Sequence, residues 1–178
     1  MYQEIIEFWF EEIDASQWWK KDEGFDETIR RRFLDVHRKA VRCELYVWRK
    51  TSLGALAEII ILDQFSRNMF REKPQSFAYD SLALALAQSA ISCGFDSALS
   101  KEKRSFLYMP FMHSESLEIH AVAESLFSKL GVQSSMEYEK RHKEIIEKFG
   151  RYPHRNKILG RVSTPEEEAF LRLPGTRF

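Results

Sequence analysis

The sequence predicts an all-helical fold in which residues 1–178 form a single domain. The chain is 178 residues long, which is the usual size of one domain. Its 7 Gly and 5 Pro are too few for the many turns of a β-sandwich or barrel. Hydrophobic residues make up 44% of the chain and aromatic residues 13%, which is enough for a core and excludes intrinsic disorder.

Apolar residues recur at helical spacing through the N-terminal half. We expect helices over residues 2–13, 25–47 and 53–70. The third is apolar on nearly every side, which is typical of a helix that is buried on nearly every side. A buried parallel strand over 59–62 is the alternative there, but the flanking sequence has the helical pattern, so we favour a helix.

Helix-breaking residues divide the C-terminal half into further helices. Thr164, Pro165 and Glu167 form a strong start signal, with a cap, a proline at the first position and a glutamate at the third. No strand pair with a hairpin signal occurs, so the fold is predicted to be all-α with seven to nine helices. The helices expected in this half are 76–92, 101–109 with its end near Pro110, 114–130, 135–149, 153–159 and 165–171.

Targeting and redox signals favour a cytoplasmic protein. Cys43 and Cys93 lie among apolar neighbours, so we expect two small buried side chains and no disulfide framework. The N-terminus lacks the basic segment of a signal peptide. The longest uncharged run, 81–95, is shorter than the roughly 20 residues that cross a bilayer. No membrane partner is expected, and the sequence leaves the oligomeric state open.

The total charge is balanced, but its distribution is not. Lys+Arg and Asp+Glu both number 27, which excludes attraction of the whole molecule to nucleic acid or an anionic membrane. Residues 1–30 nevertheless hold nine acids and three bases, whereas residues 141–161 hold seven bases and two acids. Either the two ends attract each other, or the C-terminal stretch forms an anion-binding face.

The first candidate site is the polar string from Asp63 to Asn68 inside the most apolar predicted helix. Asp63 and Arg67 are four residues apart and therefore share a helix face. An unpaired buried charge is costly, so the two form an internal ion pair or serve a ligand. In the second interpretation Arg67 binds an anion, Asp63 holds it in place and Asn68 binds the same ligand.

The second candidate site surrounds His113 and Glu115. We expect Pro110 to end one helix and Ser114 to cap the next, with Glu115 in its first turn, where the helix dipole favours a carboxylate. Glu115 also continues an apolar stripe, which predicts that it faces inward. That stripe consists of Ile119, Val122 and Leu126. His113 is a candidate general base, and Glu115 is assigned to the catalytic set with it.

The third candidate site is the basic segment 149–161. Two glycines and a proline frame a short stretch rich in hydrogen-bond donors, and a helix start near Pro153 adds backbone N–H groups for an anion. A basic surface turn is the alternative, but so dense a mixture favours a site. The ligand-binding candidates are Arg151, Arg155, Asn156 and Arg161, and His154 is a candidate for proton transfer.

No specific metal or cofactor motif is present. Glu139 and His142 have the Glu-x-x-His spacing of di-iron bundles, but such a site needs two motifs and two further carboxylates. The sequence contains no Cys-x-x-Cys, His-Glu-x-x-His, phosphate-binding loop or Gly-x-Ser-x-Gly motif. We therefore predict neither a metal nor a cofactor, and the basic stretch matches no RNA-recognition module.

Long strings of the sequence are shared with one family. They are Ile61–Asn68, Leu107–Glu115, Phe149–Asn156, Phe8–Phe10 and Leu159–Glu167. Over roughly residues 4–171 the chain thereby resembles the bacterial domain-of-unknown-function family 924. The resemblance implies an all-helical fold of the tetratricopeptide-like superhelical type and implies no activity. Ser66 stands where a proline is usual, and His120 stands where a glutamine is usual. If that glutamine lines a site, His120 alters the choice of ligand.

The polar strings support three hypotheses about function. In the first, the three candidate sites meet in one pocket that binds a small anionic molecule, with hydrolysis as the reaction class. The arginines supply positive charge, Asp63 and Glu115 orient them, and His113 or His154 transfers a proton. In the second, a non-enzymatic tetratricopeptide-like module binds a peptide or RNA segment in its groove. In the third, the strings are internal hydrogen-bonded networks that fix helix packing.

Overall fold

A computed structural model describes residues 1–176 of the chain. No strand occurs among these residues, which confirms the all-α prediction. Ten helical segments carry labels, but α3 and α4 are joined by a helical turn into one helix, so the described residues form nine helices, within the predicted range. The helices are α1 (Tyr2–Glu7), α2 (Glu23–Val41), α3 (Ser52–Ile60), α4 (Ser66–Met69), α5 (Asp80–Ser92), α6 (Lys101–Met112), α7 (Leu117–Leu130), α8 (Gln133–Phe149), α9 (Asn156–Leu159) and α10 (Pro165–Leu171).

These residues divide into two compact units. Unit 1 comprises Met1–Arg71 and Gln75–Pro110, and unit 2 comprises Glu72–Pro74 and the chain from Phe111 onward. The single domain predicted for residues 1–178 and the tetratricopeptide-like repeat both stay predictions. Within the described part of the chain, every helix is too short or too polar to span a membrane.

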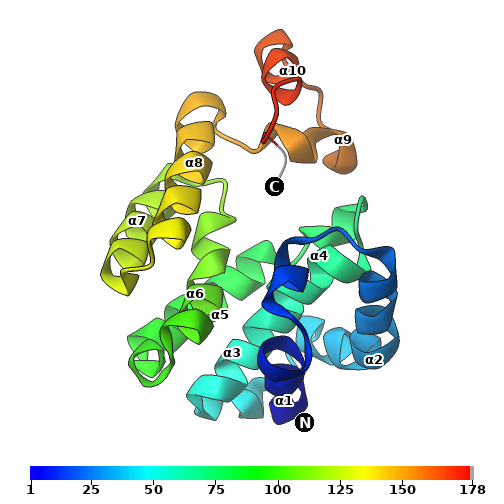
Figure 1. Cartoon of the computed structure of the whole chain (residues 1–178), viewed down its shortest axis with the longest axis vertical. Helices are drawn as coiled ribbons and strands as arrows, with labels where there is room; N and C mark the ends of the chain where they lie inside the picture. The colour runs from blue at the N-terminus through cyan, green and yellow to red at the C-terminus, as the bar shows by residue number, and fades with distance from the viewer. Residues whose placement is uncertain (177–178) are drawn as a thin grey trace. The chain divides into compact units, whose positions relative to one another are not determined.

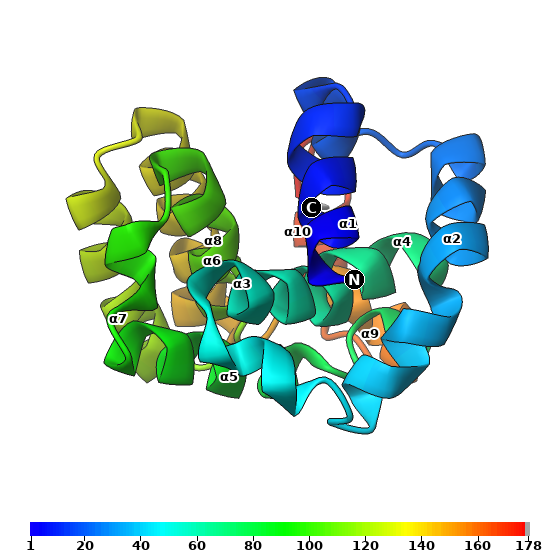
Figure 2. The ribbon, with the colours of Figure 1, turned by 90° about the horizontal axis from the view of Figure 1, so that it is seen from below.

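Unit 1 is built around one continuous helix over residues 52–69. It consists of α3, a π-helical turn (Ile61–Phe65) and α4. The continuous helix packs against α1, α2 and α5 (Figures 1 and 2). Every residue from 54 to 66 is buried, as expected for a helix that is apolar on nearly all sides. The structure therefore confirms a helix, and not a strand, over 59–62.

The start of α3 is determined by Thr51 and Gly54. The Thr51 hydroxyl accepts a hydrogen bond from the Gly54 N–H at 3.1 Å, which caps the helix. A Cβ atom on Gly54 would lie only 2.2 Å from the backbone oxygen of Trp48. Only glycine therefore allows the chain to approach this closely before the helix begins.

Aromatic rings fill the space beside the π-helical turn. The Phe65 ring lies 5.0 Å from Phe33, 5.5 Å from Trp9 and 6.0 Å from Phe8, measured between centroids. All four side chains are buried. Phe8 and Trp9 belong to the π-helical turn Phe8–Glu12 that continues α1, and they are the buried residues of that turn.

Unit 2 contains α7 and α8, which lie side by side (Figure 1), followed by α9 and α10. Its apolar core holds Ile145, Ile146 and Tyr152, with Phe149 and Phe170 packed against them. α8 ends at Gly150, whose φ of +68° favours glycine.

The start signal predicted for the last helix is confirmed. The Thr164 hydroxyl accepts a hydrogen bond from the Glu167 N–H at 3.2 Å. The Glu167 carboxylate in turn accepts one from the Thr164 N–H at 2.8 Å. Pro165 occupies the first helical position, where a missing N–H costs nothing.

The predicted helix end near Pro110 is wrong. α6 runs through Pro110 to Met112. A proline inside a helix removes one backbone hydrogen bond, but here the two residues after it are buried, with Phe111 2% and Met112 6% exposed. Their burial offsets the lost bond, so the helix continues for two more residues.

The predicted start of the following helix is also wrong. α7 begins at Leu117 and its cap position is Ser116, whereas the Ser114 hydroxyl lies before the helix and accepts a hydrogen bond from the Ser116 N–H. The inward face therefore lies one position away from the predicted stripe, and Val122 is 46% exposed. The buried residues of α7 are His120, Ala123, Phe127 and Leu130.

Two further predictions fail in unit 1. Both Cys43 and Cys93 are exposed, because each lies in a turn that follows a helix end. The helix expected over 25–47 already ends at Val41, and Val47 is 52% exposed. Cys43 lies two residues after Val41 and has a φ of 58°, a backbone conformation that cannot continue a right-handed helix.

Candidate functional site

The second and third candidate sites come together in unit 2 at Glu115. The Glu115 carboxylate accepts a hydrogen bond from the Tyr152 N–H at 2.8 Å. It also accepts two from the Arg161 guanidinium, at 2.7 and 2.9 Å. Burial acts to raise the pKa of Glu115, but the hydrogen bonds from Arg161 and the Tyr152 N–H outweigh it, so the pKa is lowered. Glu115 is therefore a carboxylate that joins two turns of the chain.

A second carboxylate, Glu167, holds the other side of the basic segment. Arg151 donates to both oxygens of Glu167, at 2.6 and 2.8 Å. Asn156 donates to Glu167 at 3.1 Å and accepts a hydrogen bond from Arg161 at 2.9 Å. The hydrogen bond from Arg151 lowers the pKa of Glu167 to about 2. Two of the predicted anion-binding arginines, Arg151 and Arg161, are thus held by carboxylates of the same unit.

Arg155 is a buried cation of unit 2, with 6% of its surface exposed. Its guanidinium carbon lies 4.7 Å from the centre of the Tyr152 ring, within the range of a cation–π contact. Its Nη2 donates to the backbone oxygen of His113 at 2.9 Å. Arg155 therefore fastens the turn at His113 to the turn at Tyr152.

Histidine rings surround the same tyrosine. The centroid of the Tyr152 ring lies 5.6 Å from His142 and 5.6 Å from His154. The His113 ring lies 6.5 Å from His142. Burial lowers the pKa of His142 to about 3, so this ring is neutral at physiological pH. His113 and His154 are partly exposed, as groups that exchange protons with a ligand need to be.

A buried pair that sequence reasoning did not assign lies behind Tyr152. His120 Nδ1 is 2.7 Å from Glu139 Oε1, and both side chains are fully buried. His120 Nε2 is 3.0 Å from the Tyr152 hydroxyl and 2.9 Å from the Ser114 backbone oxygen. Burial raises the pKa of Glu139, although the hydrogen bond with His120 acts in the opposite direction.

Two signals could have revealed this pair. His120 stands where the family usually has glutamine, and Glu139 belongs to the Glu-x-x-His spacing that we set aside as a chance metal motif. That spacing does place Glu139 and His142 on the same buried face of α8. Among residues 1–176 no group of three or more His, Cys, Asp or Glu side chains is arranged to hold a metal ion.

The first candidate site belongs to unit 1. Arg67 pairs with Asp80 through two hydrogen bonds of 2.9 and 3.0 Å, and with Asp63 at 3.1 Å. Gln64 donates to the other oxygen of Asp63 at 2.6 Å. Asn68 donates to Asp26 at 2.8 Å. Asp63 and Arg67 are therefore paired within unit 1 together with Asp80, and Asn68 binds a separate acid, Asp26. The single pocket drawn from all three segments stays a prediction.

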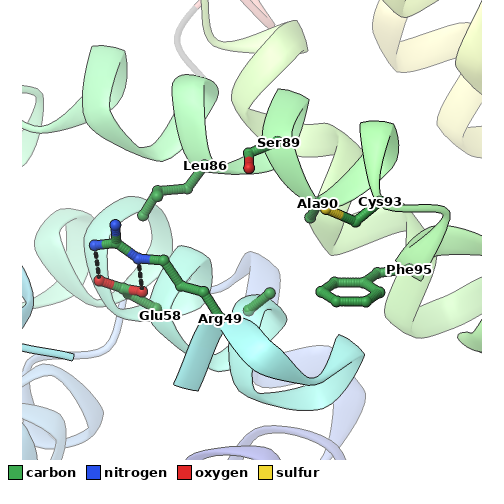
Figure 3. A pocket seen from close by; sticks show the side chains of 8 residues that line it. Arg49, Glu58, Leu86, Ser89, Ala90, Cys93 and Phe95 are labelled. Atoms are coloured by element: carbon green, nitrogen blue, oxygen red, sulfur yellow. Dashed lines mark hydrogen bonds and ion pairs between the residues drawn. The ribbon is translucent and has the colours of Figure 1, made fainter. Parts of the chain in front are cut away.

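Unit 1 also has a small pocket that the sequence did not predict (Figure 3). Glu58 is fully buried in its wall, and Arg49 binds both carboxylate oxygens of Glu58 at 2.7 Å. Cys93 and Phe95 lie on the opposite side of the view. The remaining lining residues are Ala55, Leu86, Ser89 and Ala90. The charge of the arginine is balanced by the glutamate beside it.

Comparison with known proteins places this geometry in a family. The profile of the bacterial protein family of unknown function DUF924 matches residues 5–175. A solved structure of a protein of unknown function, ATU0120 from Agrobacterium tumefaciens, is 39% identical, with a TM-score of 0.92 and 96% of each chain covered. No curated protein matches the chain. Because the family profile spans nearly all of the sequence, the chain belongs to the DUF924 family of bacterial proteins of unknown function.

Proposed function

We propose that unit 2 binds a small anionic molecule at the polar cluster around Tyr152. The observation that supports this most is that a buried guanidinium, Arg155, lies against the Tyr152 ring beside two partly exposed histidines, His113 and His154. Burying a cation is costly, and proteins accept that cost most often where the charge meets a ligand or a fixed partner.

The surrounding contacts supply the rigidity that a binding site needs. Glu115 joins the turn that contains His113 to the turn that contains Tyr152, through its hydrogen bonds with the Tyr152 N–H and Arg161. Glu167 ties the start of α10 to Arg151. Because these ion pairs have two hydrogen bonds each, they fix orientation as well as position. In the proposed site Glu115, Arg151, Arg161 and Asn156 act as the frame.

The proposed reaction class is hydrolysis of the bound anion. His113 and His154 are the groups that would move a proton, because imidazole is the side chain best suited to do so near neutral pH. Arg155 would hold the negative charge of the substrate beside them. Glu115 has a lowered pKa, so it stays ionised and serves as an orienting group.

Arg67 of unit 1 remains a second candidate for anion binding, and it is tested separately. Its guanidinium is held by Asp63 and Asp80. Replacing Arg67 by Ala removes this candidate without altering any residue of unit 2. A ligand response that Arg67→Ala abolishes would assign the site to unit 1 and overturn the assignment to Arg155.

A thermal-shift titration tests the proposal. The probes are inorganic phosphate, citrate and adenosine monophosphate, which present three kinds of anion. At a concentration of about 100 times Kd, a single-site ligand adds about 2.7 kcal/mol, or roughly 5–10 °C in Tm for a chain of this size. We expect the shift in the wild type to be lost in Arg155→Met and reduced in His154→Gln. Arg172→Gln, whose side chain is 80% exposed, is the matched control and should keep the shift.

Two outcomes would contradict the proposal. One is the absence of a shift with all three probes. The other is an equal shift in wild type, Arg155→Met and His154→Gln. Salt-sensitive binding of single-stranded RNA without any response to small anions would instead support the second sequence hypothesis, in which the chain binds a peptide or RNA segment.

A further inference from the structure

The buried pair His120 and Glu139 has a hydrogen-bond arrangement that determines where its protons lie. The Tyr152 hydroxyl donates to the backbone oxygen of Met112 at 2.5 Å. A hydroxyl has only one hydrogen, so towards His120 the same oxygen can only accept. The Ser114 backbone oxygen, the other neighbour of His120 Nε2, is an acceptor as well. His120 Nε2 must therefore carry a hydrogen.

The other nitrogen of the ring must then share a proton with Glu139. His120 Nδ1 and Glu139 Oε1 are 2.7 Å apart, which is the distance of a strong hydrogen bond. Such a bond needs one hydrogen between the two atoms. That hydrogen belongs either to an imidazolium facing a carboxylate or to a carboxylic acid facing a neutral imidazole. In both states the pair holds the same number of protons and has no net charge.

We propose that His120 and Glu139 are a positioning pair that shares one proton and fixes the Ser114 carbonyl and the Tyr152 hydroxyl from behind the proposed site. This inference rests on the proposed function. His120 touches both turns that carry the candidate groups, since Ser114 follows His113 and Tyr152 precedes the His154–Arg155 pair. Neither member of the pair is exposed, so both act through other residues.

The atom Glu139 Oε2 supports a positioning role. It is buried and has no hydrogen-bond partner among the described residues. A buried carboxylate with one unpaired oxygen is unfavourable, because desolvation penalises its charge. Keeping this oxygen buried costs free energy, which is common for groups whose arrangement serves a site. The other charged groups that face it are Glu124 and Lys143, on α7 and α8.

Substitutions of Glu139 separate a positioning role from a merely structural one. In Glu139→Gln the amide can donate to His120 Nδ1, so the Nε2–H is kept and the turns stay in place. In Glu139→Ala, His120 Nδ1 loses its hydrogen-bond partner. We expect the Kd for the best of the three probes to change less than twofold in Glu139→Gln and to rise about tenfold in Glu139→Ala, as when an orienting partner is lost. Glu137→Gln, an exposed acid on the same helix, is the control.

Replacing His120 tests the shared proton through pH, and it does not require a ligand. In His120→Gln, the side-chain amide N–H can donate to the Ser114 oxygen and the Tyr152 hydroxyl only if the amide oxygen points at Glu139. Glu139 must then be protonated, because only a protonated carboxyl can donate to that oxygen. Since burial raises the pKa of Glu139 in the folded state, Tm should fall as pH rises from about 4.5, its unfolded value. The double variant His120→Gln/Glu139→Gln should lack this fall, because it has no carboxyl group at position 139.

Nitrogen-15 spectra of the imidazole rings provide the direct readout. We expect His120 to show a protonated Nε2 throughout pH 5–8. A His120 ring with a bare Nε2, or equal probe affinity in wild type and both Glu139 variants, would overturn the proposal. If no probe binds but the Nε2–H and the pH response of His120→Gln are found, the proposed function fails while the proton assignment stands.

Discussion

At the centre of unit 1 the rings of Phe8, Trp9 and Phe33 surround Phe65, whereas at the centre of unit 2 histidines and a guanidinium surround Tyr152. The first arrangement gains free energy from apolar burial without needing a specific partner for each atom. The second needs a partner for every buried polar group, because each unsatisfied one costs about 1–3 kcal/mol. The binding site proposed for unit 2 would explain why that unit has the costlier arrangement.

The ion pairs of unit 2 sharpen this contrast. Glu115 and Glu167 each bind an arginine through two hydrogen bonds, and each is also bonded to a backbone N–H. In unit 1 Arg67 pairs with Asp63 and Asp80, and Arg49 pairs with the buried Glu58 through two hydrogen bonds. The ion pairs of unit 2 therefore also hold the backbone of its turns.

The largest expected effect is the loss of a ring in unit 1. Phe65→Ala leaves a cavity between three other aromatic side chains and should lower the free energy of unfolding by about 3–5 kcal/mol. Urea denaturation followed by circular dichroism measures this. Tyr46→Ala, at a side chain of unit 1 that is 64% exposed, is the control and should stay within about 0.5 kcal/mol of the wild type. A cost below about 1 kcal/mol for Phe65→Ala would show that this cluster is not the core of unit 1.

The next largest effect is acid destabilisation through His37 in unit 1. Burial lowers the pKa of His37 from 6.5 to about 4, so the folded state binds fewer protons than the unfolded state. The contribution of His37 to the free energy of unfolding is therefore fully present above pH 6.5 and is lost as pH falls towards 4. This loss is at most about 3 kcal/mol. Urea denaturation at pH 7, 5.5 and 4 should show a smaller loss in His37→Gln than in the wild type.

The comparison of units predicts a different response in unit 2. The pKa of His142 is lowered to about 3, which destabilises the folded state on acidification in the same direction as His37. The raised pKa of Glu139 acts the opposite way, because its folded form takes up a proton more readily. His154→Gln, at a partly exposed ring, is the control for His37→Gln. Identical pH profiles for both variants would refute the assignment to His37.

The fold was predictable where local spacing decides it. The Thr164–Glu167 cap and the buried helix 52–69 depend on residues three or four apart, so the sequence contains the whole cause. The end of α6 was not predictable, since the burial of Phe111 and Met112 decides it and burial is a tertiary property. The exposed Cys43 and Cys93 show the same limit, because apolar neighbours in sequence do not guarantee a buried position.

The candidate site was predictable in its residue types but not in its pairings. The Glu115–Arg161 contact joins residues 46 positions apart, and the His120–Glu139 contact joins residues on two helices. Nothing in the local pattern states which arginine a carboxylate will bind. The sequence therefore predicts a ligand for Arg151 and Arg161, whereas in the structure carboxylates of their own unit bind them.

A smaller effect is expected at the tyrosine of unit 2. Tyr152→Phe keeps the ring that contacts Arg155 but removes the hydroxyl, leaving the Met112 oxygen and His120 Nε2 with one partner fewer. Loss of a buried hydrogen-bonding partner costs about 1–3 kcal/mol. Urea denaturation measures this cost, and His120 Nε2 should keep its hydrogen because Ser114 still accepts it. Phe170→Leu, which changes the edge of the same core without a polar atom, is the control. An unchanged stability would mean that in the wild type the hydroxyl gains as much from water in the unfolded chain as it gains from these partners in the folded protein.

The smallest effect concerns the serine that departs from the family pattern. The Ser66 hydroxyl lies 2.9 Å from His37 Nε2 and 3.5 Å from the Ile61 oxygen, and both side chains are buried. Ser66→Ala removes one neutral hydrogen bond and should cost about 1 kcal/mol in urea denaturation at pH 7. Because His37 loses its partner but not its burial, the acid response of the variant should persist with the same sign. If Ser66→Ala instead abolished the acid response, the hydroxyl and not desolvation would control the protonation of His37.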